Sequence, residues 1–122
     1  MLLLALLPFL VACTPSGTAV FDDDGKRVGR VSIRNEERAT VIDRAGETVG
    51  TVREDRVFDS AGNRVGRVTE DDRILDSAGT RIGRIGGGTR CINRAGVRAG
   101  VIGSDIDDEA AGGACLLLLL LP

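Results

Sequence analysis

Residues 57–68 read VFDSAGNRVGRV, and this stretch decides the fold because four other segments repeat its pattern without internal gaps. The pattern is apolar, apolar, Asp or Asn, two variable residues, Gly, two variable residues, apolar, Gly, one variable residue and apolar. The other copies are VFDDDGKRVGRV from Val20, VIDRAGETVGTV from Val41, ILDSAGTRIGRI from Ile74 and CINRAGVRAGVI from Cys91. Successive copies start 21, 16, 17 and 17 residues apart in a chain of 122 residues. A repeat of this density is the feature to interpret first.

Each copy is typical of a β-hairpin. Asp59 opens a four-residue turn and Gly62 closes it, which suits a type I turn followed by a residue with positive φ. β-Branched and aromatic residues flank the turn, as expected of short strands. Charged spacers such as residues 69–72 then reverse the chain toward the next copy.

A second glycine recurs in the returning strand of every copy. Glycine inside a strand costs stability, so a repeated one needs a structural reason. A bulge, a sharp bend or the close approach of another backbone would each supply that reason. The five positions are Gly29, Gly50, Gly66, Gly83 and Gly100.

The five hairpins, residues 20–103, predict an all-β closed ring or shallow barrel. A propeller blade takes about 40 residues, more than each unit has, and a β-solenoid would need capped ends. A closed ring needs no caps and leaves no sheet edge exposed. About ten short strands would leave a hole at the axis, wider than that of a well-filled eight-stranded barrel.

The C-terminal residues 104–122 are expected to form a capped hydrophobic helix that plugs this hole. Residues 114–121 are continuously apolar, which is about 12 Å of helix and far below the ~30 Å core of a bilayer. Six consecutive leucines make every face apolar, and such a helix is normally buried all round. Ser104 and the acidic residues after it suit a helix N-terminus. A calcium site is the alternative, but the spacing does not match an EF-hand loop.

The N-terminal residues 1–12, MLLLALLPFLVA, carry no charge and have the length of the apolar region of a signal peptide. Residues 10–13, Leu-Val-Ala-Cys, resemble the lipobox of bacterial lipoproteins, and residues 13–19 would form the linker after it. The resemblance implies cleavage before Cys13, a lipid on its thiol and an anchor in the bacterial cell envelope, at the outer membrane in a Gram-negative cell. A signal peptide usually has Lys or Arg before its apolar region, and residues 1–12 contain neither. The alternative is an uncleaved apolar N-terminus that packs on the domain.

Residues 20–121 resemble the five-fold β-flower family in their five units and terminal leucine run. The resemblance implies hairpin petals around a short barrel with a hydrophobic C-terminal helix in its centre. That arrangement is similar to Tubby C-terminal-like and phospholipid-scramblase-like barrels, which act at membranes. The family has no established activity, and a fold alone does not assign one. The fifth unit departs from the pattern with Cys91, Asn93 and Ala99.

The composition excludes several classes of function. The chain has no His, so it has no Ser-His-Asp triad, no Cys-His dyad and no His-ligated zinc. It has no Trp or Tyr and only three Phe, which argues against base-stacking platforms, and its net charge of −2 argues against a basic nucleic-acid binder. We therefore expect a non-enzymatic protein with no cofactor, no metal and no nucleic-acid partner.

Arginines recur at equivalent positions of the units. One interpretation is an anion or phospholipid-headgroup site, because guanidinium donates two hydrogen bonds to phosphate. The alternative is a set of exposed cross-strand pairs with Asp22, Asp43, Asp59 and Asp76. The first set of arginines is Arg27, Arg64, Arg81 and Arg98, and the second is Arg30, Arg67 and Arg84.

Two further groups leave alternatives open. With Cys13 acylated, Cys91 and Cys115 remain either for a disulfide or as two small buried thiols. Residues 22–24 are three consecutive Asp that suggest a cation, although an Asp-rich turn is more often only a turn.

These features favour a lipid-anchored envelope protein that serves as a structural or binding module. Its expected partners are the membrane, through the lipid on Cys13, and an envelope protein or an anionic lipid. The alternative is a membrane-lipid-interacting protein that uses the arginine ring or the C-terminal leucine helix.

Overall fold

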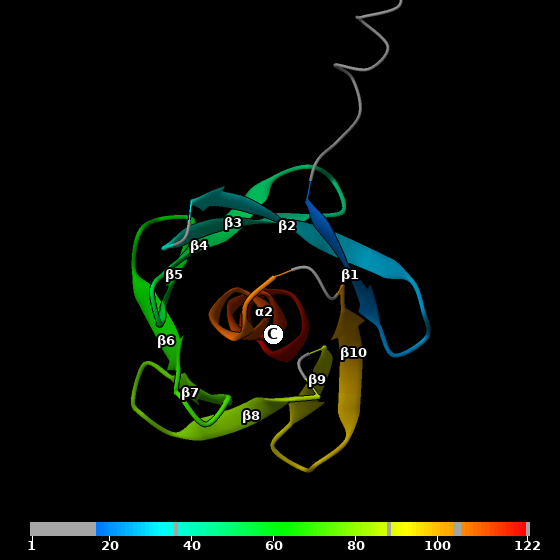
Figure 1. Cartoon of the computed structure of the whole chain (residues 1–122), viewed down its shortest axis with the longest axis vertical. Coiled ribbons are helices and arrows are strands. Elements are labelled where there is room, and N and C mark those ends of the chain that lie inside the picture. The colour runs from blue at the N-terminus through cyan, green and yellow to red at the C-terminus, as the bar shows by residue number, and fades with distance from the viewer. Residues whose placement is uncertain (1–16, 36, 88, 104–105, 122) are drawn as a thin grey trace, which may run out of the picture.

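A computed structural model describes residues 17–121 except 36, 88, 104 and 105. Ten antiparallel strands pair in chain order, and β1 pairs with β10 to close the barrel (Figure 1). The predicted closed ring of five hairpins is thereby confirmed. The strands are β1 (Thr18–Asp22), β2 (Arg27–Asn35), β3 (Arg38–Asp43), β4 (Thr48–Arg53), β5 (Arg56–Asp59), β6 (Arg64–Val68), β7 (Arg73–Asp76), β8 (Arg81–Gly86), β9 (Arg90–Asn93) and β10 (Arg98–Ile102).

The Asp-x-x-Gly turns have the predicted geometry. The Gly62 amide donates to the Asp59 carbonyl at 3.0 Å, and Gly62 has a φ of 89°. The Asp59 carboxylate accepts from the amides of Ala61 and Asn63, each at 2.9 Å, so the side chain holds its own turn together. Asn93 does the same in the fifth hairpin, because its amide oxygen offers an equivalent acceptor.

A bulge sits beside the second glycine of every hairpin. In β5–β6, Val57 pairs with Gly66 and Phe58 pairs with Arg64, so Val65 is the extra residue. The other four hairpins shift register at the equivalent place. The extra residues pack against the core while half exposed, so the bulge turns an additional apolar side chain inward.

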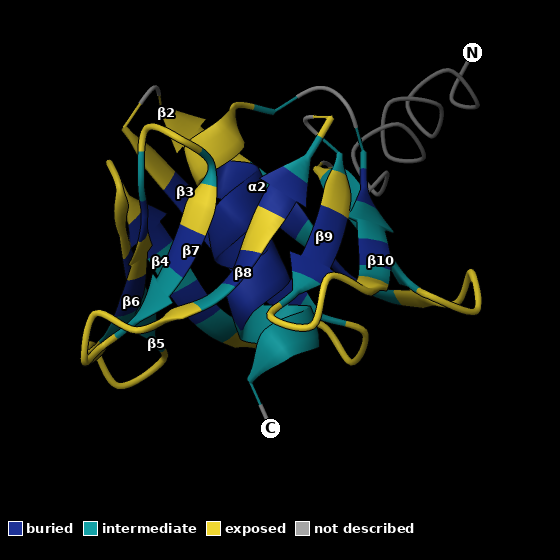
Figure 2. Ribbon diagram, turned by 90° about the horizontal axis from the view of Figure 1, so that it is seen from below, coloured by how far each residue is buried: buried dark blue, intermediate teal, exposed yellow. Residues whose placement is uncertain are grey.

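The barrel has two different ends. We call the end with the Asp-x-x-Gly turns the turn end, and the end with the connections between hairpins the loop end. At the turn end the hairpins splay outward (Figure 2). β1 starts at the loop end, where Thr18 pairs with Val31, and the plug ends at the turn end, where Leu121 lines the same hollow as Arg94 and Ala95.

The C-terminal segment runs along the barrel axis, as predicted, but its helix begins later. α2 (Asp108–Ala114) is followed directly by a π-helix, η2 (Cys115–Leu120). The N-cap is Asp107, whose carboxylate accepts from the Ala110 amide at 2.9 Å. The prediction that Ser104 caps the helix is therefore wrong, and Ser104 itself lies outside the described residues.

Small residues, rather than leucines, fill the narrow part of the barrel. Residues 110–116 are buried, whereas residues 117–121 are only half-buried at the turn end (Figure 2). A methyl group on Gly112 would lie 2.8 Å from Val68 Cγ1, so the wall leaves no room for a larger side chain there. The expectation that the leucine run is buried all round is wrong, because only Leu116 is fully buried and residues 117–121 stay partly exposed at the turn end.

Each of the five strand glycines faces one leucine of the plug. A methyl group on Gly66 would lie 2.6 Å from Leu116 Cδ2, and the other four glycines would meet their own leucine at 2.7–2.9 Å. At each position a carbonyl oxygen of the neighbouring strand lies closer still, so the approach of that backbone, together with the leucine, is the reason that the glycine recurs. The pairs are Leu116 with Gly66, Leu117 with Gly50, Leu118 with Gly29, Leu119 with Gly100 and Leu120 with Gly83.

These pairs explain why the plug changes to a π-helix. Leu116 to Leu120 contact the third, second, first, fifth and fourth hairpins in turn. Each residue therefore faces the hairpin next to the one before, a rotation of one fifth of a circle per residue. An α-helix turns by about 100° per residue, too much for this match. The wider π-turn, closed by the Leu121 amide donating to the Leu116 carbonyl at 3.0 Å, brings the rotation nearer to one fifth of a circle.

Candidate functional site

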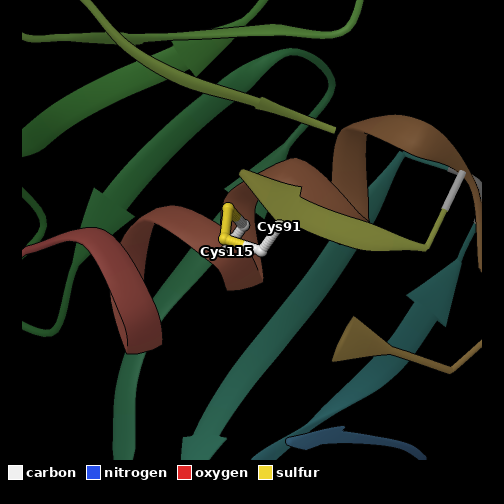
Figure 3. The surroundings of a disulfide bond; sticks show 2 residues. All are labelled: Cys91 and Cys115. Atoms are coloured by element: carbon white, nitrogen blue, oxygen red, sulfur yellow. A yellow bond between two sulfur atoms is a disulfide. The ribbon is translucent and has the colours of Figure 1, made fainter. Parts of the chain in front are cut away.

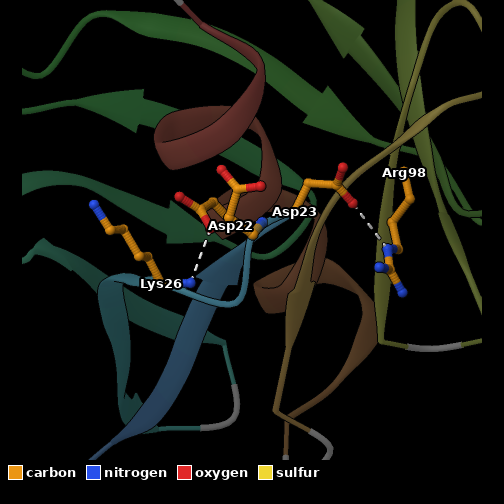
Figure 4. Close-up of polar contacts among 5 residues, drawn as sticks. Asp22, Asp23, Lys26 and Arg98 are labelled. Atoms are coloured by element: carbon orange, nitrogen blue, oxygen red, sulfur yellow. Dashed lines mark hydrogen bonds and ion pairs between the residues drawn. The ribbon is translucent and has the colours of Figure 1, made fainter.

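The first arginine set lies around the barrel and does not form a single site. Each of the four is the first residue of a returning strand and is exposed. Because each belongs to a different hairpin, the topology distributes them around the circumference. Arg98 Nε forms an ion pair with Asp23 of the neighbouring hairpin at 3.2 Å (Figure 4). Arg64 donates to the Ser77 carbonyl of the next hairpin at 3.5 Å, so these two arginines contact adjacent hairpins.

The alternative pairing of these arginines with the turn aspartates is wrong. The carboxylates of Asp22, Asp43, Asp59 and Asp76 all accept hydrogen bonds from backbone amides of their own turns. Those amides lower the pKa of Asp59, the Asn63 amide most, because they stabilise the charged carboxylate. The aspartates are therefore turn formers rather than arginine partners.

The three consecutive aspartates of the first turn also have local roles. Asp22 Oδ1 accepts from the amides of Asp24 and Lys26 at 2.9 Å, and Asp23 contacts Arg98 (Figure 4). Within the described part of the chain, no group of three or more Asp, Glu, Cys or His side chains could hold a metal ion.

Cys91 and Cys115 form a disulfide that joins the barrel wall to the plug (Figure 3). Their Cα atoms are 5.5 Å apart, and both residues are fully buried. Cys91 takes the core position that Val20, Val57 and Ile74 occupy in other units. Of the two alternatives that the sequence left open, the structure contains the disulfide. The fifth unit thus departs from the repeat where it attaches to the plug.

A cavity of about 660 Å³ opens at the loop end, and sequence reasoning missed it. Its walls are the loop-end parts of β2 and β3 with the connection between them, the β4–β5 and β6–β7 connections, and the start of α2. The floor is apolar and the rim is charged. The buried floor residues are Ala39, Val52, Val68 and Ala110, and the charged rim residues are Glu37, Arg38, Glu54, Asp55, Arg67, Glu70, Asp107 and Glu109.

The sequence carried one signal for this cavity. The first two copies start 21 residues apart, whereas the others start 16 or 17 apart. The additional residues lengthen β2 to nine residues, and its exposed end projects at the loop end of the barrel (Figure 2). The irregular spacing therefore builds one wall of the cavity.

Carboxylates crowd together around the start of α2. Burial raises the pKa of Asp72, and its hydrogen bond with Asp108 and the negative charges of Asp108, Glu109 and Asp71 raise it further. Of these carboxylates, Glu109 also lines the cavity.

Comparison of the chain with protein-family models, curated proteins and solved structures found no match. Among the described residues, no helix is long and apolar enough to cross a membrane. Cys13, the predicted lipidation residue, lies outside the described residues.

Proposed function

We propose that the chain is a non-enzymatic, lipid-anchored structural or binding module of the bacterial envelope, related to the five-fold β-flower family. The observation that carries the proposal is the disulfide between Cys91 and Cys115. Structural disulfides form and persist in oxidising compartments outside the cytoplasm. The lipobox-like residues 10–13 supply both the export signal and the anchor, so two separate parts of the sequence agree on the compartment.

The geometry gives this module an orientation. Cys13 precedes Thr18 by five residues, which span at most about 18 Å when extended. A lipid on Cys13 would therefore keep the loop end near the bilayer. The turn end, with its half-buried leucines and exposed arginines, would point away from it and be available to an envelope partner.

This orientation weighs against the alternative function. A plug helix that entered the anchoring bilayer would have to do so from the loop end, but its leucines emerge at the turn end. The arginines of the first set likewise begin strands at the turn end. Either feature could reach lipid only in an opposing membrane.

Mass spectrometry of the mature N-terminus tests the anchor directly. We expect a chain that starts at Cys13 with a diacylglyceryl modification, and a Cys13→Ser variant that leaves the membrane fraction. Cys13 is not one of the two disulfide cysteines, so this variant keeps the barrel bond. An unmodified chain that starts at Met1 would refute the anchor.

Binding of anionic liposomes tests the alternative. We expect the lipidated chain and a variant with Arg→Gln at Arg27, Arg64, Arg81 and Arg98 to bind an added layer of anionic vesicles equally. A loss of vesicle bridging in that variant would instead support a lipid-interacting protein.

A further inference from the structure

We propose that the loop-end cavity binds a small organic cation, an alkylammonium group carried on an apolar stem. The cavity lies at the opposite end of the barrel from the Asp-x-x-Gly turns, and the proposal stands whether or not Cys13 is acylated. It adds a ligand class to a barrel whose repeat by itself assigns none.

The size of the cavity suits a small molecule. Its volume of about 660 Å³ falls within the range of small-ligand pockets. Its floor is made of buried aliphatic side chains, including Val52 at 3% exposure and Val68 at 1%. Such a floor contacts an apolar stem without leaving a polar group unpaired.

The charge on the rim selects a cation. Six carboxylates line the cavity against only two guanidinium groups, those of Arg38 and Arg67. In the described part of the chain none of these six carboxylates is within ion-pair distance of an arginine, and the ion pair between Arg98 and Asp23 lies at the other end of the barrel. The rim therefore carries an excess of negative charge, and such an excess concentrates ligands of the opposite sign.

The walls that carry the carboxylates are held in place by backbone hydrogen bonds. The Glu54 amide donates to the Glu37 carbonyl at 2.7 Å, which ties the β4–β5 connection to the long β2–β3 hairpin. The Val68 amide donates to the Asp55 carbonyl at 2.8 Å, which ties the same connection to β6. The backbone of the site is therefore held in place before a ligand arrives, and the ordering cost of binding falls mainly on the exposed rim side chains.

The arrangement favours an organic cation over a metal ion. No three carboxylates in the described residues converge closely enough to hold a metal. Carboxylates spread around an apolar floor instead match a molecule with an ammonium group at one or both ends of a hydrocarbon chain.

Isothermal titration of the full chain in non-ionic detergent micelles tests the site with three probes. Spermine and 1,5-diaminopentane are the cationic probes, and glutarate is an anionic probe of similar length. We expect saturable binding of the two amines below about 1 mM, weakened several-fold when NaCl rises from about 20 mM to about 200 mM, and no binding of glutarate.

A pair of double variants locates the binding. Glu54→Gln with Glu70→Gln removes two exposed rim charges and is expected to weaken spermine binding about threefold to tenfold. Asp24→Asn with Glu47→Gln removes the same charge from exposed residues at the turn end and serves as the matched control, with affinity expected to change less than about twofold.

Three results would overturn the proposal. The first is no saturable binding of either amine, and the second is equal weakening in the two double variants, which would mean that only the net charge matters. The third is much tighter binding of a lysine tripeptide than of spermine, which would assign the cavity to a peptide partner.

Discussion

Replacing Gly66 by Ala tests whether the plug fits the wall as closely as the structure indicates. A methyl group there would lie 2.6 Å from Leu116 Cδ2 and would also press on the Leu75 carbonyl oxygen. The backbone carbonyl is fixed by sheet pairing, and Leu116 is fully buried, so neither neighbour moves aside easily. Gly66 has an ordinary strand φ, so Ala would otherwise gain about 0.4–1 kcal/mol from the unfolded state.

The magnitude follows from overpacking. Additional methyl groups in a well-packed core cost about 1–3 kcal/mol and sometimes more. Leu116→Ala alone would remove a buried side chain at a cost of about 2–5 kcal/mol. If the two residues touch, shortening Leu116 relieves part of the Gly66→Ala strain. The double variant is then expected to lose about 1–2 kcal/mol less unfolding free energy than the sum of the two single losses.

Urea unfolding followed by far-ultraviolet circular dichroism measures this coupling, since the chain has no Trp or Tyr for intrinsic fluorescence. The matched control combines Gly66→Ala with Leu119→Ala, because Leu119 faces Gly100 in another hairpin. That pair is expected to be additive within about 0.5 kcal/mol. Additivity of both pairs would refute the one-to-one packing. If the Leu116 variant does not fold, Gly50 with the half-buried Leu117 repeats the test at lower cost.

Three further predictions concern the disulfide and the titrating carboxylates. Reduction of the bond between Cys91 and Cys115, which are 24 residues apart, should cost about 3 kcal/mol, seen as a lower urea midpoint in reductant; an unchanged midpoint would mean that the bond does not stabilise the plug. Asp59 has a lowered pKa in the folded chain, so its contribution to stability is present above its unfolded pKa and is lost as pH falls; Asp59→Asn should keep the turn and flatten this acid dependence, as unfolding at several pH values would show. Asp72 has a raised pKa in the folded chain, so its ionised form opposes folding at neutral pH. Asn tolerates the φ of 64° at this position, so Asp72→Asn should raise the urea midpoint at pH 7 and lose that advantage in acid. A stabilisation that persists in acid would show that charge is not the cause.

The hairpins could be predicted from the sequence because each is determined by contacts within a few residues. Asp59 and Gly62 close a turn through hydrogen bonds that span two to four positions, and the same letters recur five times. Closure of the ring followed from the unit length and from the need to cover sheet edges. These inferences needed no knowledge of how distant side chains pack.

The features that the sequence did not reveal depend on contacts between distant segments. The acidic residues after Ser104 are compatible with several helix starts, and the start at Asp108 is seen only with the barrel present. The π-turns of residues 115–120 arise because five leucines meet five glycines from strands far apart in the chain. The loop-end cavity likewise joins three connections and the plug, so no single segment contains its pattern.

Three features that break the five-fold symmetry give the barrel its disulfide, its cavity and its plug. Cys91 replaces a core aliphatic residue and bonds the wall to the plug. The long first spacer raises β2 above the rim and walls the cavity. The axial segment cannot itself be five-fold, and it meets the ring by placing one leucine on each hairpin. A repeated scaffold offers five similar surfaces, and the first arginine set is spread over four of them, with Thr48 at the equivalent position of the second hairpin. Because the plug occupies the axis, a site that occurs once in this barrel lies where one part of the ring differs from the rest. In this barrel that reasoning leads to the loop-end cavity beside β2 and β3, rather than to the repeated arginines.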